Sequence, residues 1–398
     1  MEALVIARTT SPAWDILHLL SRAGFSVDIV TTSRHLRLSR FARTVHSVTS
    51  DKPLAPSAYD VVRRRGKPYD WVIATDDLTL RALALLEWPP GMRLKFLPST
   101  TPEILPHLCS KIGLSRVLSA GGIRTPPFRI ARNYVEAIEA ASAIGYPVML
   151  KVDFSGGGEG VHECARDADI VALRHLFSEQ PLLAQKKIEG TVLDLSAIFF
   201  DRELVHFTYS TCERRSKRFG VSVVRTYYPL ALVNGEIFTE LGTLGNVLGA
   251  SGFVNITCIK GADGIRHYIE ADMRPNAWAD FSRFFGEDAA PRIRNWFSSR
   301  VRLTKANAGR RGAGQAPLTI PYFLRLGSWE LLTNRHAVWQ FIPLADARLV
   351  RRLLLVKFLS FALATEIMSS VLLKIKWLVP LKLRNIARGF LTALTDGL

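Results

Sequence analysis

The chain has 398 residues, of which 48% are hydrophobic and 10% aromatic, and it carries a formal net charge of +17. Its length suits two or three domains, and its apolar content excludes a wholly disordered polypeptide. The charge is uneven, because residues 301–398 hold 15 Lys and Arg against 4 Asp and Glu and so contribute +11. No nucleic-acid-binding signature accompanies this charge, so we expect a basic appendage and no nucleic-acid partner.

The cysteines and the apolar segments predict a cytoplasmic protein. The cysteines lie far apart, without the spacing of a metal site, which is typical of reduced core residues. They are Cys109, Cys164, Cys212 and Cys258. The apolar start of the chain is too short for a signal peptide. Charges interrupt the apolar run 353–379, so no uncharged stretch approaches the ~20 residues that span a bilayer.

The first hundred residues alternate between apolar runs typical of strands and amphipathic runs typical of helices. Expected strands cover 3–7, 25–31, 69–75 and 94–98, and expected helices cover 12–23, 57–65 and 78–86. This alternation predicts a parallel sheet with crossover helices, and residues 33–43 between them are expected to form a basic loop. Asp76 and Asp77 follow the third strand, and we expect them to cap and begin the next helix in preference to contacting a substrate.

The rest of the chain divides at proline- and glycine-rich segments. A helix over 109–120 precedes an extended linker with two prolines, which marks a domain boundary. We therefore expect an N-terminal α/β domain over 1–108 and a second domain over 109–300. The second domain divides into a small part, about 123–184, and a central part, about 185–300. Residues 301–398 form a basic, largely helical extension.

A glycine-rich loop follows a strand that carries one lysine. Residues 146–161 read YPVMLKVDFSGGGEGV, with Lys151 in the strand and Gly156, Gly157, Gly158 and Gly160 in the loop. Consecutive glycines leave backbone N–H groups free to close on a ligand, most often a phosphate. The pattern is neither a P-loop nor a dinucleotide fingerprint. The alternative is a hairpin tip beside an ordinary surface lysine.

A second polar cluster lies in a predicted hairpin over 253–276. Alternation along its second strand places Ile269, Ala271 and Met273 in the core, and the opposite face then carries Tyr268, Glu270, Asp272 and Arg274. Glu270 and Asp272 lie roughly 7 Å apart by strand geometry, close enough to share a cation. Asn255 lies on the paired strand. The alternative is a solvent-facing surface with a Glu/Arg ion pair.

Together these pieces resemble the ATP-grasp superfamily, and in particular carbamoyl-phosphate synthase large subunits, biotin carboxylases and carboxylate–amine ligases. The resemblance covers roughly residues 1–300. Its pieces are Lys111 in a helix, AGGI at 120–123, TPPF at 125–128, YPVMLK at 146–151, the loop 155–160 and IEADMRPN at 269–276.

This resemblance implies a fold, a cofactor and roles for particular residues. The fold is an N-terminal parallel α/β domain followed by a two-subdomain ATP-grasp fold, and the cofactors are ATP and Mg²⁺, with Mn²⁺ as an alternative ion. The implied nucleotide-binding residues are Lys111, Lys151, Ser155, Gly156, Gly157, Gly158, Gly160, Gln185, Lys186 and Ile188. Asn255, Glu270 and Asp272 would hold the metal. Arg274 and Lys151 would act on the transferred phosphoryl group.

Three positions depart from the family pattern. Gln185 replaces the glutamate that usually opens the adenine hinge. Val192 falls where an acid usually holds the ribose, which leaves Asp194 or Glu189 as substitutes. Asp272 replaces an asparagine and keeps an oxygen for the metal.

The resemblance implies a ligase that activates a carboxylate as an acyl phosphate and transfers it to an amine or similar nucleophile. The alternatives are carboxylation through carboxyphosphate and a nucleotide-binding scaffold without turnover. The expected partners are a small-molecule carboxylate and an amine. Arg225, Arg283 and the basic segment 213–218 either bind an acidic substrate or are surface charge.

The C-terminal quarter lies outside the resemblance. Residues 306–317 have the composition of a flexible basic linker. From Asp346 the apolar residues recur with a helical period at Leu349, Leu353, Val356, Leu363, Ile367 and Val371. These helices are expected either to pack on the catalytic domain or on a second subunit, as in a homodimer, or to lie on an anionic membrane. The basic residues that favour the membrane are Arg348, Arg351, Arg352, Lys374, Lys376, Lys382, Arg384 and Arg388.

Overall fold

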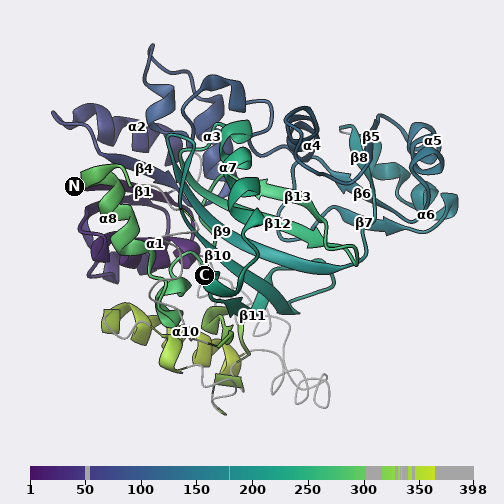
Figure 1. Cartoon of the computed structure of the whole chain (residues 1–398). Coiled ribbons are helices and arrows are strands. Elements are labelled where there is room, and N and C mark those ends of the chain that lie inside the picture. Colours follow the sequence, from purple (N-terminus) through teal and green to yellow (C-terminus); the bar gives the residue numbers. More distant parts are fainter. Residues whose placement is uncertain are drawn as a thin grey trace, which may run out of the picture.

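The structure is a computed structural model with three sheets arranged side by side (Figure 1). It describes residues 1–49, 54–178, 180–301, 304, 316–327, 330–331, 333, 339–342 and 346–363, with side chains in the last helix as far as Lys357.

The N-terminal sheet is parallel, has four strands and runs in the order β3-β2-β1-β4. Its strands are β1 (Glu2–Ala7), β2 (Ser26–Thr31), β3 (Ala42–Ser47) and β4 (Trp71–Ala74). Its helices are α1 (Thr10–Arg22), α2 (Leu54–Arg64) and α3 (Asp77–Leu85). Residues 3–7 are fully buried, with Val5 in one core and Leu4 and Ile6 in another. A central parallel strand covered on both faces has this uniformly apolar sequence.

The prediction of a fourth strand at 94–98 is wrong. Short 3-10 turns, η2 (Arg93–Lys95) and η3 (Pro102–Ile104), occupy that region, where Phe96 and Leu97 are buried. The fourth strand is β3, which begins at the end of the segment expected to be a loop, after η1 (His35–Leu38). Most β3 side chains are partly or fully exposed, so an edge strand held by backbone hydrogen bonds to β2 carries no apolar signal.

The small sheet carries the glycine-rich loop. It has four antiparallel strands in the order β5-β8-β6-β7, and α5 and α6 lie with it in a separate lobe (Figure 1). Its strands are β5 (Phe128–Ala131), β6 (Val148–Val152), β7 (Val161–Cys164) and β8 (Leu182–Lys186). Its helices are α4 (Lys111–Ala120), which precedes it, α5 (Tyr134–Ile144), α6 (Asp167–Ala172) and η4 (Arg174–Ser178). The loop is therefore a hairpin tip between β6 and β7, as the sequence predicts.

The large sheet lies between the other two and carries the acidic cluster (Figure 1). It has six antiparallel strands in the order β13-β12-β9-β10-β11-β14. These are β9 (Thr191–Phe200), β10 (Glu203–Arg215), β11 (Ser222–Tyr228), β12 (Gly252–Lys260), β13 (Arg266–Asp272) and β14 (Leu318–Pro321). The associated helices are η5 (Leu230–Leu232), α7 (Glu236–Leu248), η6 (Phe281–Phe285) and α8 (Ala289–Ser299). Together the parallel and antiparallel sheets give the mixed α/β class that the sequence predicts.

The described part of the C-terminal extension packs against the rest of the chain. After β14 come η7 (Phe323–Arg325) and α10 (Ala347–Leu363). Asp346 accepts hydrogen bonds from Trp14 Nε1 at 3.0 Å and Ser39 Oγ at 2.6 Å, and Leu349 and Leu353 are fully buried. The start of α10 is therefore docked on the N-terminal domain, within the same chain. Residues 364–398, which hold most of the basic positions behind the membrane prediction, lie outside the described residues.

The helices that the structure describes include none with the length and apolar character needed to cross a membrane.

Candidate active site

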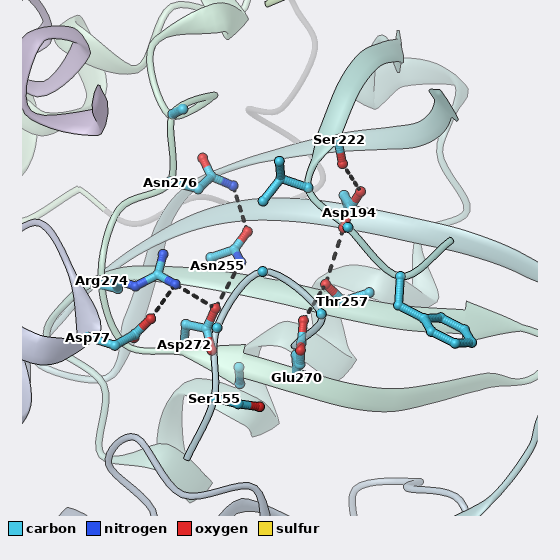
Figure 2. Close-up of a pocket in the computed structure, with 18 of the residues that line it drawn as sticks. Asp77, Ser155, Asp194, Ser222, Asn255, Thr257, Glu270, Asp272, Arg274 and Asn276 are labelled. Carbon is cyan, nitrogen blue, oxygen red and sulfur yellow. Dashed lines mark hydrogen bonds and ion pairs between the residues drawn. The ribbon is translucent and has the colours of Figure 1, made fainter. Parts of the chain in front are cut away.

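A cavity lies where the large sheet meets the glycine-rich loop and the start of α4 (Figure 2). Its wall includes residues from the N-terminal domain, the small sheet, the large sheet and the segment after β14. The polar side chains lining it include Asp77, Lys111, Asp194, Arg215, Arg225, Asn255, Thr257, Glu270, Asp272, Arg274, Asn276 and Arg325.

The register of β12 and β13 brings the predicted metal-binding residues together. Asn255 pairs with Asp272 and Thr257 with Glu270, so all four side chains border one cavity. Asn255 Nδ2 donates to Asp272 Oδ2 at 3.2 Å, and Thr257 Oγ1 lies 3.4 Å from Glu270 Oε2. Asn276 Nδ2 donates to the side-chain amide oxygen of Asn255, Oδ1, at 2.6 Å. In this arrangement Asn255 orients Asp272, while the two carboxylates face the cavity.

The expected placement of Tyr268 beside Glu270 is wrong. The pairing of β12 with β13 shifts between Thr257 and Cys258, which skips one residue of β13 at Ile269. Such a bulge reverses the alternation of side chains on the two sides of it. Tyr268 is therefore buried with the core and donates through its hydroxyl to Glu240 at 2.7 Å.

Arg274 and Asp77 join the large sheet to the N-terminal domain at the cavity. Arg274 Nη2 donates to Asp77 Oδ2 at 2.6 Å and to Asp272 Oδ2 at 3.2 Å (Figure 2). Asp76 caps α3 as expected, because its side chain accepts a hydrogen bond from the Thr79 backbone N–H at 2.8 Å. Asp77 is the first-turn acid, as expected, and it also lines the cavity.

Negative charge accumulates around Asp272. Burial raises the pKa of Asp272 to about 7, against the opposing effect of Arg274, and the nearby Asp77 and Glu270 carboxylates raise it further. A carboxylate held near other carboxylates in a desolvated position is stabilised by an added cation. The described residues include no cluster of three or more His, Cys, Asp or Glu side chains arranged for a metal. Glu270 and Asp272 match the needs of Mg²⁺ by their chemistry, since this ion takes one or two carboxylates and completes its shell with water and phosphate oxygens.

Lys151 is a buried cation on β6. Its side chain is only 7% exposed, and Nζ donates to Gln185 Oε1 on β8 at 2.7 Å. Burial lowers its pKa to about 8, Glu270 opposes this effect, and Lys111 adds to it. Lys151 therefore lies within electrostatic reach of both the acidic cluster and the second predicted phosphate-binding lysine.

The glycine-rich loop borders the cavity and is hydrogen-bonded to Lys111. Ser155, Gly156, Gly157 and Gly158 line the cavity, whereas Gly160 does not. Lys111 Nζ donates to the Ser155 carbonyl oxygen at 2.8 Å and to its hydroxyl at 3.1 Å.

Gly158 lets this loop approach the turn between β10 and β11. Its φ is +77°, and a Cβ atom at this position would lie 1.8 Å from the carbonyl oxygen of Phe219. Only glycine fits both the dihedral angle and the approach.

The predicted adenine hinge and ribose partner lie apart from this cavity. Gln185, Lys186 and Ile188 are absent from the cavity wall, and Lys186 Nζ donates to the Gly145 carbonyl oxygen at 2.8 Å. Val192 pairs with Ile259 in the sheet. Their roles toward a nucleotide remain predictions.

Asp194 is buried and already has several partners. It accepts hydrogen bonds from Thr257 Oγ1 at 3.1 Å and Ser222 Oγ at 3.1 Å, and it lies 3.3 Å from Arg225 Nη2. Glu189 pairs with Lys187 at 2.6 Å.

Several cavity residues were not predicted as part of the site. They include Ser11, Asp77, Thr257, Asn276, Trp278 and Arg325. Asn276 ends the segment 269–276 that carries the resemblance, without a predicted role of its own, and Trp278 lies two residues beyond it. Arg283, a candidate for acidic substrates, bonds instead to Asp280 and is absent from the cavity wall.

Sequence comparisons find similarity to known proteins over part of the chain. The model described as carbamoyl-phosphate synthase L chain, ATP binding domain, matches residues 114–187. An uncharacterised protein of Sinorhizobium fredii is 31% identical over 103 residues, which is 24% of this chain and 21% of that protein. The carbamoyl phosphate synthase large chain of Pseudothermotoga lettingae is 26% identical over 175 residues, or 38% of this chain and 15% of that one. The matches thus span about a fifth or less of these relatives' own length.

Solved structures match over most of the chain. The biotin carboxylase domain of Hydrogenobacter thermophilus 2-oxoglutarate carboxylase, in complex with MgADP, ADP and bicarbonate, has a TM-score of 0.60 at 16% identity and covers 77% of this chain and 72% of its own. The ADP complex of Staphylococcus aureus N5-carboxyaminoimidazole synthetase has a TM-score of 0.60 at 13% identity, covering 84% and 85%. The chain therefore has the ATP-grasp fold, with a segment similar to the ATP-binding domain of carbamoyl-phosphate synthase large chains.

Proposed function

We propose that the protein is an ATP- and Mg²⁺-dependent ligase that activates a carboxylate as an acyl phosphate and joins it to an amine or similar nucleophile. The observation that carries this proposal is the convergence of two clusters on one cavity. Lys111 and the glycine-rich loop come from the small-sheet side, and Glu270, Asp272 and Arg274 come from the large sheet. We also propose the division into 1–108, 109–300 and 301–398, with the two sheets of the middle part closing over the nucleotide.

The acidic pair fits a magnesium ion. Glu270 and Asp272 would hold it, with Asn255 supporting Asp272 through the hydrogen bond at 3.2 Å. When bound, the ion would neutralise phosphate charge. Mn²⁺ has similar ligand preferences and is an alternative.

The chain's own residues would position the reactants and stabilise charge. In the first step, a carboxylate oxygen of the substrate bonds to the γ-phosphorus of ATP while the bond to the β–γ bridging oxygen breaks and ADP leaves. Arg274, Lys151 and Lys111 would stabilise the charge on the transferred group. In the second step, the amine nitrogen bonds to the acyl carbon, phosphate leaves, and the nitrogen loses a proton.

The glycine-rich loop would protect the intermediate. An acyl phosphate hydrolyses in water, so an enzyme that forms one benefits from a closed site. Gly158 already lies against Phe219, in the turn between β10 and β11 of the large sheet, which supports a role for the loop as a closing flap.

Carboxylation through carboxyphosphate is the second candidate. The biotin carboxylase domain that resembles this chain in fold was solved with bicarbonate. Bicarbonate would then take the place of the organic carboxylate, and the first step would be unchanged.

The direct test supplies ATP, Mg²⁺ and pools of carboxylates with hydroxylamine as the nucleophile. Acyl phosphates react with hydroxylamine to give hydroxamates, so the ligase should release ADP and form hydroxamate in equal amounts. ADP release that requires bicarbonate and gives no hydroxamate identifies the carboxylation reaction. ATP binding without ADP release in every pool contradicts both reactions and supports a scaffold.

Cellular location and association are further proposals. We propose a cytoplasmic protein whose basic C-terminal helices contact anionic membranes peripherally. Replacing the exposed Arg348, Arg351 and Arg352 with glutamate should abolish co-sedimentation with phosphatidylserine vesicles while leaving the fold intact. Equal sedimentation of the variant and the parent chain on anionic and neutral vesicles contradicts the membrane contact.

A further inference from the structure

One wall of the cavity carries more positive charge than its carboxylates balance. Arg215, Arg225 and Arg325 all line this wall, which Asp194 shares. Asp194 lies 3.3 Å from Arg225 and 3.9 Å from Arg215. In the part of the chain that the structure describes, Arg325 has no carboxylate within salt-bridge distance. The excess positive charge of this wall would therefore attract an additional anion.

Arg225 is buried with unused hydrogen-bond donors. The residue is 5% exposed, and Nη2 is shared between Asp194 and Ser222 Oγ, each at 3.3 Å. Nε and Nη1 have no hydrogen-bond partner among the described residues. Buried donors without acceptors are rare and costly in native proteins, and although the Tyr227 hydroxyl lies near Arg225, a bound anion would supply a stronger acceptor.

Arg325 reaches this wall from the C-terminal part of the chain. Strand β14 pairs with β11, with Ile320 opposite Arg225, and η7 then directs Arg325 toward Ser222, whose carbonyl oxygen accepts from Nη1 at 2.8 Å. Burial lowers the pKa of Arg325, and the positive charges of Arg225 and Arg274 lower it further, although Tyr322 and Asp15 oppose this change. This crowding of guanidinium groups supports an anion site.

The arginine wall adjoins the acidic cluster. The ring of Trp278 lies 4.9 Å from the Arg225 guanidinium carbon, and the Trp278 backbone N–H donates to Asn276 Oδ1 at 3.0 Å. Asn276 in turn donates to Asn255, which supports Asp272. A short molecule can thus reach both walls of the cavity.

The N-terminal domain closes the far side of this wall. Ser11 and Pro12, in the first turn of α1, line the cavity, and Ser11 Oγ lies 2.7 Å from the hydroxyl of Tyr322. Tyr322, which directly precedes η7, therefore helps to hold this part of the cavity wall in place.

We infer that Arg225 and Arg325 bind a second acidic group of the substrate, so that the acid activated by this enzyme is a small dianion, either a dicarboxylate or a carboxylate that carries a phosphoryl or phosphonyl group. This inference rests on the proposed ligase function. It assigns specificity for the acid jointly to Arg225 on β11 and to Arg325 on η7, and η7 lies after residue 300, where the family resemblance ends. Bicarbonate and simple monocarboxylates lack the second group.

The test compares pairs of acids of matched chain length in the hydroxamate assay with the full chain. Succinate and 3-phosphonopropionate provide the second anion in its two forms, and butyrate lacks it. We expect hydroxamate from one of the dianions at concentrations where butyrate gives none. Replacing Arg325 with methionine should raise the KM for that dianion about 30-fold or more and leave the ATP dissociation constant unchanged.

Two controls separate an anion site from damage to the fold. The Arg325→Lys variant should recover part of the affinity, and Arg348→Met, an exposed arginine on α10, should behave like the parent chain. Preference for butyrate, or a KM that Arg325→Met does not change, overturns the inference and leaves the ligase function standing. Where the parent chain shows no turnover with any acid, calorimetric titration with inorganic phosphate decides. If the parent chain binds phosphate and the Arg325→Met variant does not, the anion site is supported. If the parent chain does not bind phosphate, the inference is overturned.

Discussion

The two walls of the cavity that carry the predicted chemistry are held in different ways. Glu270 and Asp272 lie on a six-stranded sheet, where the pairing of β12 with β13 fixes their separation. The glycine-rich loop spans the gap between two strands and is held by Lys111 and by the approach of Gly158 to Phe219. A rigid acidic wall suits a metal, because coordination tolerates little error in position. A loop held by a few local contacts suits a flap, because a nucleotide can replace those contacts.

The largest expected effect comes from the rigid wall. Replacing Glu270 with glutamine removes one of two carboxylates facing the cavity and should lower kcat by about 10²–10³-fold. The matched variant Asp272→Asn keeps an oxygen for the metal and should retain most of the activity. The rate of ADP release, measured for each variant over a titration with Mg²⁺, tests both expectations. Equal losses in the two variants contradict the expectation that a side-chain oxygen without charge is enough at position 272.

The next effect comes from Lys151, a buried cation that is absent from the cavity wall but lies within electrostatic reach of Glu270. Lys151→Met should raise the KM for ATP and lower kcat, because a phosphate-binding charge is lost. The combined effect should lower kcat/KM for ATP by about 10²-fold. Lys260→Met removes an exposed lysine from β12 and should have no effect. Steady-state kinetics measures the difference between the two variants, and circular dichroism checks that both are folded. Full activity of the Lys151 variant rules out the phosphate assignment.

The protonation of Lys151 gives a smaller and reversible effect. Burial lowers its pKa to about 8 in the nucleotide-free protein, and bound phosphate raises the pKa again. ATP binding therefore takes up a proton above pH 8, so affinity should fall by up to about tenfold per pH unit there. Calorimetric titrations of ATP from pH 7 to pH 10 measure this, and the Lys151→Met variant should lose the slope. A flat profile for the parent chain contradicts the prediction.

The smallest effect comes from the loop. A Cβ atom on Gly158 would collide with the Phe219 carbonyl oxygen, so Gly158→Ala should hold the loop away from the cavity and raise the KM for ATP by a few fold. Gly156→Ala is the matched control, because its Cβ atom would meet nothing within 4 Å. Hydrogen exchange at residues 155–161 should increase only in the Gly158 variant. In the parent chain, Mg-ATP should slow this exchange.

Alternation and glycine content predicted the hairpin loop after Lys151 and the placement of Asn255 on the strand paired with Glu270 and Asp272, because both depend on neighbours in sequence. The same reasoning failed at Tyr268, where a bulge reverses the alternation, and at β3, whose exposed side chains give no apolar signal. A bulge is a property of two paired strands, so one strand's sequence does not reveal it.

The sequence by itself determined the parallel α/β character of the first domain, the glycine-rich loop and the acidic pair, since local propensity and a period of two encode them, whereas the two-subdomain fold that follows was implied by a family resemblance. Only the tertiary structure brought Asp77 against Arg274, 197 residues apart, and placed Arg325 beside Arg225. It also docked Asp346 onto Trp14 across 332 residues. Such contacts depend on how whole sheets pack together, and no local pattern specifies that packing. The wall that we assign to the substrate's second anion is therefore a product of the fold as a whole.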